Sequence, residues 1–172
     1  MKRLLYTSIA TIMILITISL NAFAMPYNPD NYTSVDEVSA LLPAGVKQSK
    51  VSKGAVTRGN FFMGADLVIR DNGDGTVGAL AIAYTAIPID EAYTSVYLDQ
   101  WDETTERWRQ VNYYEAEFYK ADYPDGLKTP TVDISFTGQP RGRYYRLRGV
   151  FGVVSNGEFE GASATTDGVL LN

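Results

Sequence analysis

The sequence predicts an all-β fold, a seven-stranded antiparallel β-sandwich preceded by a signal peptide and a short N-terminal helix. Two observations lead to this prediction. From about residue 59 onward, apolar and polar side chains alternate with a period of two, which is typical of strands with one buried face. Clusters of Gly, Asn, Asp and Pro separate these stretches at the regular spacing expected of an antiparallel sandwich.

The first 24 residues have the features of an export signal. Lys2 and Arg3 provide the positive start, residues 4–20 an apolar run, and Ala22-Phe23-Ala24 a cleavage site of small residues. We therefore expect cleavage after residue 24 and secretion to the outside of the cell. The apolar run is long for a signal peptide, so retention as a membrane anchor is the alternative.

Composition narrows the functions that are possible. Cleavage would leave 148 of the 172 residues, enough for one domain with its own core. Loss of Lys2 and Arg3 reduces the 15 basic residues to 13, against 20 acidic ones, so the secreted form would carry a net charge near −7. An acidic surface repels phosphate backbones and anionic lipids, which argues against nucleic acid or a membrane as partner. The chain has no His and no Cys, and we predict no cofactor, no metal site and no catalytic residue.

Residues 25–58 are polar with scattered Pro and are predicted to form an N-terminal arm. Ser34 stands three residues before Glu37, which is the spacing of a helix-capping box. The apolar side chains that would share one helical face are Val35, Val38, Leu41 and Leu42. Pro43 then ends the pattern, so we expect a helix of two turns, too short to be stable unless it docks on the main domain. The sequence leaves that docking open.

The domain predicted at residues 59–172 contains seven expected strands. They cover about residues 60–70, 76–85, 93–101, 108–119, 131–137, 142–154 and 158–170. Residues 71–75 read Asp-Asn-Gly-Asp-Gly, which predicts a hairpin turn between the first two strands. The same residues resemble a calcium-binding loop, but Arg70 and Ala81 would then stand at its first and last ligand positions, where neither can bind calcium.

The strand at residues 142–154 is the centre of the predicted fold. The side chains expected to face the core are Tyr145, Leu147, Phe151 and Val153. Asn156 and Gly157 follow, and this pair tolerates the positive φ angles of a tight two-residue turn. We therefore expect a hairpin between this strand and the last one.

The strand at residues 108–119 does not show which of its faces is buried. One candidate face carries Trp108, Tyr114 and Phe118, and the other carries Val111, Tyr113 and Tyr119. A β-bulge within the strand would allow it to use both.

The segment from Tyr144 to Gly149 resembles strand F of immunoglobulin-like and fibronectin type III domains. In this resemblance Tyr145 is the tyrosine that closes the corner before the strand, and Leu147 stands where an antibody domain carries a cysteine. The seven strands then correspond in order to A, B, C, C′, E, F and G. The signal sequence and the segments VYLDQWDE, NYYEAEF, GRYYRLRG and TTDGV also resemble small secreted bacterial domains of unknown function. This second resemblance implies export and fold and adds no mechanism.

A catalytic role would have to rest on carboxylates. Acidic residues gather in two places, Asp99 with Asp102 and Glu103, and Glu115 with Glu117. Such pairs formally allow a glycosidase-like hydrolase, but the second pair shares one strand face, which is equally the pattern of a solvated face. The sequence contains no G-x-S-x-G nucleophile motif and no glycine-rich nucleotide loop. A small secreted carboxylate hydrolase is therefore an alternative to the leading hypothesis, which is binding.

If the strands named C′, C, F and G share a sheet, their outward side chains form a candidate binding face. Its members are Tyr97, Asp99, Trp101, Tyr144, Arg146 and Arg148. Arg and aromatic side chains give recognition surfaces large contact area and planar hydrogen bonding, and aromatic rings stack on sugars. The same side chains can instead stabilise the sheet, with Asp99 or Glu115 as cross-strand partners of the arginines. We predict a secreted, non-catalytic binding or interaction module at or outside the cell surface, for a glycan or a protein, with a purely structural envelope protein as a further alternative.

Overall fold

The computed structural model describes residues 28–54 and 60–172, so the expected signal peptide lies outside the described residues. Within them the chain forms nine β-strands and two 3-10 helices of three residues each. The strands are β1 (Gln48–Gly54), β2 (Phe62–Asp71), β3 (Val77–Thr85), β4 (Glu91–Asp102), β5 (Arg107–Tyr119), β6 (Thr131–Phe136), β7 (Tyr144–Ser155), β8 (Glu158–Thr165) and β9 (Val169–Leu170). The helices are η1 (Pro29–Asn31) and η2 (Lys120–Asp122). In this described part of the chain, neither helix is long and apolar enough to cross a membrane.

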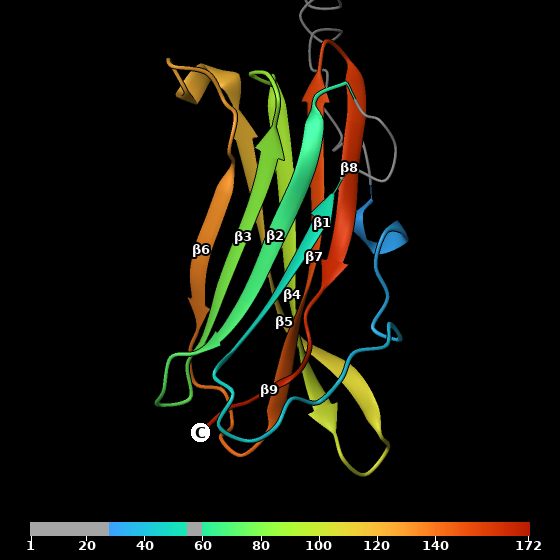
Figure 1. Ribbon diagram of the computed structural model, residues 1–172, viewed down its shortest axis with the longest axis vertical. Coiled ribbons are helices and arrows are strands. Elements are labelled where there is room, and N and C mark those ends of the chain that lie inside the picture. Colours follow the sequence, from blue (N-terminus) through green and yellow to red (C-terminus); the bar gives the residue numbers. More distant parts are fainter. Residues whose placement is uncertain (1–27, 55–59) are drawn as a thin grey trace, which may run out of the picture.

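The strands form two antiparallel sheets that pack face to face (Figure 1). The first sheet has the order β1-β2-β3-β6, and the second has the order β5-β4-β7-β8, with β9 paired to β7. The predicted all-β fold of antiparallel strands is confirmed, but the described residues form nine strands where seven were predicted. The four strands named C′, C, F and G above are β5, β4, β7 and β8, and they do share one sheet in that order.

β1 was not predicted, because it lies in the stretch expected to form the arm. It pairs along its length with β2, starting with Gln48 opposite Arg70. Its sequence, QSKVSKG, lacks apolar alternation, and Ser49 is the one buried residue of the strand. An edge strand of this kind buries too few side chains to give a periodic pattern.

The last predicted strand, residues 158–170, is divided into β8 and β9. The ladder that these strands form with β7 contains one extra residue at the break. There the Thr166 hydroxyl accepts a hydrogen bond from the Leu147 N–H at 2.9 Å, while the Thr166 N–H donates to the Leu147 carbonyl oxygen at 2.9 Å. The Thr166 side chain thus replaces a backbone acceptor. The backbone of β7 therefore keeps its hydrogen bonds at the point where the neighbouring chain changes register.

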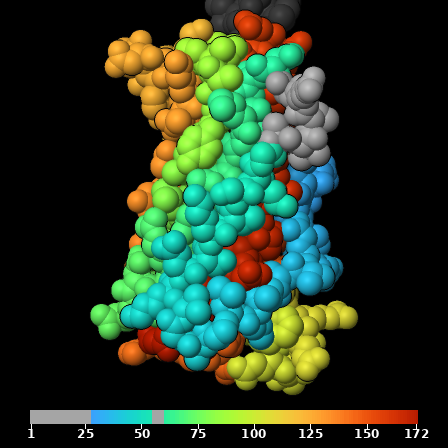
Figure 2. All heavy atoms as spheres, in the orientation of Figure 1, coloured from blue at the N-terminus to red at the C-terminus, as the bar shows by residue number. Residues whose placement is uncertain are grey.

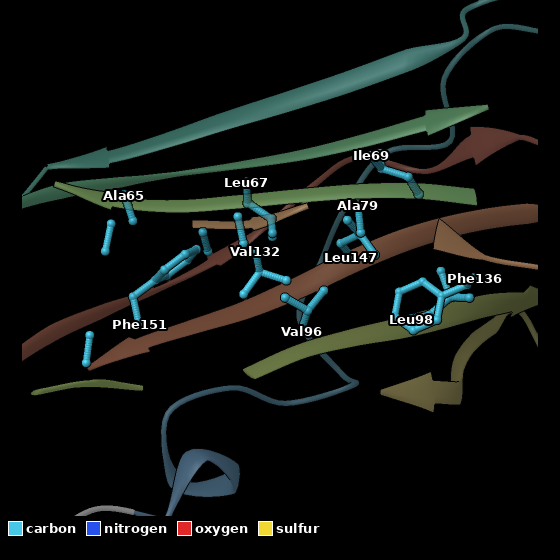
Figure 3. Close-up of a cluster of buried hydrophobic side chains, with 14 of the residues drawn as sticks. Ala65, Leu67, Ile69, Ala79, Val96, Leu98, Val132, Phe136, Leu147 and Phe151 are labelled. Atoms are coloured by element: carbon cyan, nitrogen blue, oxygen red, sulfur yellow. The ribbon is translucent and has the colours of Figure 1, made fainter. Parts of the chain in front are cut away.

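The core lies between the two sheets, where side chains from opposite layers point toward one another (Figure 3). The residues labelled there are all buried, and they come from both sheets: Ala65, Leu67, Ile69, Ala79, Val96, Leu98, Val132, Phe136, Leu147 and Phe151. The predicted core face of β7 is confirmed, because Tyr145, Leu147, Phe151 and Val153 all belong to this cluster. In a chain without cysteine, burial of this apolar surface is the main source of stability.

Both predicted hairpin turns are present. Asn156 and Gly157 form the two-residue turn between β7 and β8 with φ angles of 52° and 79°, as a primed turn requires. In the β2–β3 hairpin the Asn72 N–H donates to the Thr76 carbonyl oxygen at 3.0 Å, and residues 73–75 between them adopt positive φ angles. Local residue preferences were therefore sufficient to predict these two connections.

β5 contains a bulge, and the bulge settles which of its faces is buried. The ladder with β4 shifts register at Leu98 and Asp99, which leaves Val111 of β5 without an opposite residue. On one side of the bulge Trp108 lies on the outer face of the sheet, and on the other side Phe118 packs against the core. The bulge thus divides the first candidate face between the two sides of the sheet, whereas the members of the second, Val111, Tyr113 and Tyr119, are all exposed.

The described part of the N-terminal arm that precedes β1, residues 28–47, is called the arm from here on; it docks on the outer face of the second sheet, and the helix predicted within it is absent. Glu37 does accept a hydrogen bond from the Ser34 N–H at 3.2 Å, as in a capping box, but a single turn forms. An α-helix would need the carbonyl oxygens of Val35 and Glu37 to accept backbone N–H groups four residues further on. Here Arg146 donates to both of these oxygens, so the arm continues in an extended form and bridges to the segment after β8.

Candidate binding site

Four residues of the predicted binding face come together, but they are covered. Tyr97 lies opposite Arg148 and Asp99 lies opposite Arg146, on the outer face of neighbouring strands β4 and β7. Asp99 and Arg146 are 0% exposed, and Tyr97 and Arg148 are 4% exposed. The arm lies over them; Figure 2 shows it in blue between the red C-terminal strands and the yellow tip of the β4–β5 hairpin. The alternation of the sequence predicted that these side chains face solvent, because alternation gives the side of a sheet and not what covers that side.

Asp99 is the centre of this buried cluster. Its Oδ2 accepts hydrogen bonds from Arg146 Nε at 3.0 Å and from Arg148 Nε at 2.8 Å, and its Oδ1 accepts one from Arg148 Nη2 at 3.1 Å. Gln110 Oε1 accepts a further hydrogen bond from Arg148 Nη2 at 2.9 Å. The Arg–acid pairing considered for these strands is therefore present, in a buried form. Two guanidinium groups share one carboxylate, which leaves several of their donors to be satisfied elsewhere.

The arm supplies acceptors for guanidinium N–H groups that do not bond to Asp99. Arg146 Nη2 donates to the Val35 carbonyl oxygen at 2.7 Å, and Arg146 Nη1 donates to Ser39 Oγ at 2.9 Å and to the Glu37 carbonyl oxygen. Within the described ranges, no buried side-chain nitrogen or oxygen lacks a hydrogen-bond partner. Docking of the arm thus completes the hydrogen bonding of the cluster.

The Glu37 side chain places a second negative charge beside the arginines. Its carboxylate accepts hydrogen bonds from the Thr165 and Thr33 hydroxyls and from the Ser34 N–H. Burial raises the pKa of Glu37, but these hydrogen bonds and the charge of Arg148 outweigh it and hold the pKa below its usual value of 4.5. Two carboxylates therefore balance the two guanidinium groups under the arm.

A cleft of about 230 Å³ lies beside this cluster, between the arm and the tip of the β4–β5 hairpin. Trp101 and Trp108 stand opposite each other, with ring centroids 5.3 Å apart and an interplanar angle of 65°. Trp108 is 7% exposed, and the Arg146 guanidinium carbon lies 4.5 Å from its ring centroid. Trp101 is only partly buried and keeps part of its ring in the open cleft. The rest of the lining comes from the arm and the hairpin loop, namely residues 35–39, Glu106 and Arg107.

A second cleft, of about 310 Å³, lies further along the same face, between η1 and β5. Its lining includes Pro29, Asp30, Tyr97, Gln110, Tyr113 and Glu115. The Tyr97 hydroxyl donates to Asp30 Oδ1 at 3.1 Å, and burial together with the Asp30 carboxylate raises the pKa of Tyr97 to about 12. Tyr113 is 59% exposed, and its ring centroid is 6.5 Å from that of Tyr97. Of the six predicted residues, Trp101 lines the first cleft and Tyr97 the second, whereas Tyr144 lines neither.

Sequence reasoning found Trp101 but missed its partners in the first cleft. Trp108 was considered as a member of a candidate core face and not of a binding site, although a hairpin with its loop at residues 102–107 puts the two tryptophans opposite each other. That spacing could have revealed the pair. No sequence pattern predicted that the arm residues line this cleft. They contribute the path of their backbone and the side chain of Val38, which is 98% exposed.

The carboxylates considered for catalysis take part in structural hydrogen bonds. Asp99 is buried between the arginines, Asp102 accepts backbone N–H groups of the hairpin loop, and Glu103 forms an exposed ion pair. Glu115 and Glu117 accept hydrogen bonds from hydroxyls on or beside β5. Among residues 28–54 and 60–172, no three acidic side chains are grouped so that they could hold a metal ion. The carboxylate hydrolase stays an untested alternative.

Comparison with known proteins assigns no family to this chain. No protein-family model matches it, and neither does any curated protein. The resemblances described above therefore stay expectations, and the inference of function rests on the geometry of the clefts.

Proposed function

We propose that the protein is a secreted, non-catalytic binding module that holds a glycan in the cleft formed by Trp101, Trp108 and the arm. The observation that carries this proposal is a partly exposed tryptophan ring, held in place by a buried aromatic ring and bordered by polar side chains. Aromatic rings offer a flat apolar surface that matches the C–H face of a pyranose. The cleft is smaller than the roughly 300–1,000 Å³ of typical small-molecule sites, which suits one sugar ring of a longer chain.

The polar side chains at the rim of this cleft suit sugar hydroxyls. Asp36, Glu106 and Arg107 line the cleft, and their side chains form no hydrogen bond or ion pair with other described residues. Carboxylates accept hydrogen bonds and a guanidinium donates them, so hydroxyl groups of either orientation find partners. The lining thus combines a stacking surface with free polar groups, as glycan recognition needs.

The arrangement of the strands supports an immunoglobulin- or fibronectin type III-like sandwich. β5, β4, β7 and β8 follow the order C′, C, F and G. The Tyr145 hydroxyl donates to the Pro140 carbonyl oxygen at 2.9 Å, which matches the bond of a corner tyrosine. Many recognition modules have this architecture, but the fold alone does not identify a ligand. The proposed function therefore rests on the cleft.

Co-sedimentation of the purified protein with cell walls and a panel of insoluble polysaccharides tests the proposal. We expect retention on at least one material, with affinity reduced about tenfold or more by Trp101→Ala, because loss of ~1.4 kcal/mol of stacking corresponds to that factor. Tyr114→Ala is the control, since Tyr114 is 42% exposed and lines neither cleft. Thermal melting must show that both variants are folded. Retention on nothing, or retention unaffected by Trp101→Ala, would contradict glycan binding at this cleft.

A further inference from the structure

The two clefts are built on the same plan. In the first, the partly exposed Trp101 contacts the buried Trp108, and the Arg146 guanidinium carbon lies 4.5 Å from the centre of that buried ring. In the second, the exposed Tyr113 contacts the buried Tyr97, and the guanidinium carbon of Arg148 lies 4.8 Å from the centre of that ring. Each cleft therefore offers one exposed ring that is supported by a buried ring and an arginine.

The register of β4 with its neighbours explains this repetition. Trp101 and Tyr97 lie on the same face of β4, with Asp99 between them. The Asp99 carboxylate binds both arginines, so it sets one guanidinium beside each buried ring. The two sites are ~13 Å apart along the strand at ~3.3 Å per residue. On β5, the exposed Gln110 lies between Trp108 and Tyr113.

We propose that the two clefts are two subsites of one track for a linear, neutral oligosaccharide. One sugar ring stacks on Trp101, and another ring of the same chain stacks on Tyr113. The separation of the two rings exceeds the length of one sugar ring, so only an oligomer contacts both. This inference rests on the proposed glycan-binding function and adds to it a preference for chain length and charge.

The polar groups of the second cleft indicate the charge of the ligand. Gln110 Oε1 is occupied by Arg148, which orients the amide nitrogen of Gln110 as a donor. Asp30 and Glu115 supply acceptors for hydroxyl groups, and no basic side chain is among the described residues that line this cleft. Arg148 lies beside Tyr97 but is paired with Asp99, so the two carboxylates of the lining are left to repel an anionic sugar. Neutral chains are therefore expected to bind better than chains of uronic acids.

Both subsites are formed before the ligand arrives. Trp108 and Tyr97 are 7% and 4% exposed, and each buried ring contacts both an arginine and the exposed ring. The arm contributes to each cleft, with residues 35–39 lining the first and Pro29 and Asp30 lining the second. Little ordering is then needed on binding, which favours affinity.

Calorimetric titration with two series of soluble oligomers, cello-oligosaccharides and chito-oligosaccharides of one to six sugar units, tests the track. We expect the affinity of the unmodified protein to rise with chain length until both subsites are filled and then to stay level. Trp101→Ala should weaken binding at every length. Tyr113→Ala should leave the shortest ligands unaffected and remove the gain at longer lengths, a loss of about tenfold. Tyr114→Ala should match the unmodified protein at every length.

The outcomes separate the track from the proposed function. Binding that requires Trp101 but does not strengthen with length, or that strengthens equally in Tyr113→Ala, would overturn the two-subsite track and leave glycan binding intact. No binding to any saccharide, in solution or on insoluble material, would overturn both proposals. Oligogalacturonates provide the charge test, because binding as tight as that of the neutral series would contradict the role given to the two carboxylates.

Discussion

The outer faces of the two sheets carry similar clusters of polar side chains in different surroundings. On the first sheet, Asp66 pairs with Lys50 at 2.8 Å and accepts hydrogen bonds from Ser52 at 2.5 Å and from Tyr84 at 2.9 Å. The Lys50 side chain is 49% exposed and that of Asp66 is 15% exposed, so water reaches this cluster from the lysine side. On the second sheet, Asp99 and its two arginines lie beneath the arm and are at most 4% exposed.

The difference between the two clusters follows from the number of hydrogen-bond donors on each cation. Lysine has three donors on a flexible stem, and water hydrates those that Asp66 does not take. Each arginine has five donors in a rigid fork, so Asp99 alone cannot satisfy two of them on a buried face. The carbonyl oxygens of Val35 and Glu37 provide the missing acceptors. The hydrogen bonds of the Asp66 cluster are made within its own sheet and with water, whereas the Asp99 cluster also binds a distant segment of the chain.

We expect the largest effect from Arg146→Met. This change removes a bond to Asp99 and three bonds to the arm, and it leaves the carbonyl oxygens of Val35 and Glu37 without their donor. The free energy of unfolding should fall by about 3 kcal/mol, at the low end of the range for breaking a buried ion pair, because Arg148 still neutralises Asp99. Urea denaturation measures this loss, and hydrogen exchange should accelerate in residues 33–42.

Arg143→Met is the matched control for this experiment. Arg143 forms an ion pair with Glu103 at 3.5 Å, and the two side chains are 46% and 62% exposed. Exposed pairs of this kind contribute little, so urea denaturation and exchange in the arm should resemble those of the unmodified protein. Equal losses in the two variants would contradict the conclusion that the buried guanidinium holds the arm.

Much of the fold could be predicted from the sequence because its determinants are local. Alternation gave the two faces of β7, and the residue pair Asn156 and Gly157 gave the turn after it. β1 could not be found in this way, since it has a single buried residue, Ser49. Its place in the sheet is set by pairing with β2, which is not a local property.

The site could be predicted only in part, because its main contacts join segments far apart in the chain. Arg146 and Arg148 alternate outward just as solvent-exposed residues would, and no pattern within β7 shows that an arm covers them. The helix predicted in the arm is absent for the same reason, a contact between segments far apart in the chain. Ser34 and Glu37 satisfy the local capping rule, but Arg146, more than a hundred residues away, binds the carbonyl groups that a helix would use.

A smaller effect is expected from Glu37, which binds the arm to Thr165 through its side chain. Because its pKa lies below the usual 4.5 in the folded protein, its contribution is complete above that value and is lost as the pH falls through the folded pKa. The protection of the arm amides from hydrogen exchange, relative to their intrinsic exchange rate at each pH, should therefore fall as the pH is lowered below about 4.5. Glu37→Gln should cost about 1 kcal/mol at pH 7, the size of one or two weakened hydrogen bonds, and should remove this pH-dependent loss of protection. An undiminished response to acid in Glu37→Gln would assign the effect to another group.

The smallest effect is expected from Asp66→Asn on the first sheet. The hydrogen bond from Lys50, followed by that from Ser52, lowers the pKa of Asp66, so charge and hydrogen bonding do act on this carboxylate. Asp66 is only partly buried and its partner Lys50 is 49% exposed, however, so water can replace lost partners; the melting temperature should change little and exchange in the arm should not change. Asp99→Asn is the matched substitution, and it should lower the melting temperature clearly because two buried guanidinium groups lose their counter-charge. If Asp66→Asn destabilised the protein as much as Asp99→Asn, burial beneath the arm would not be what makes the second cluster important.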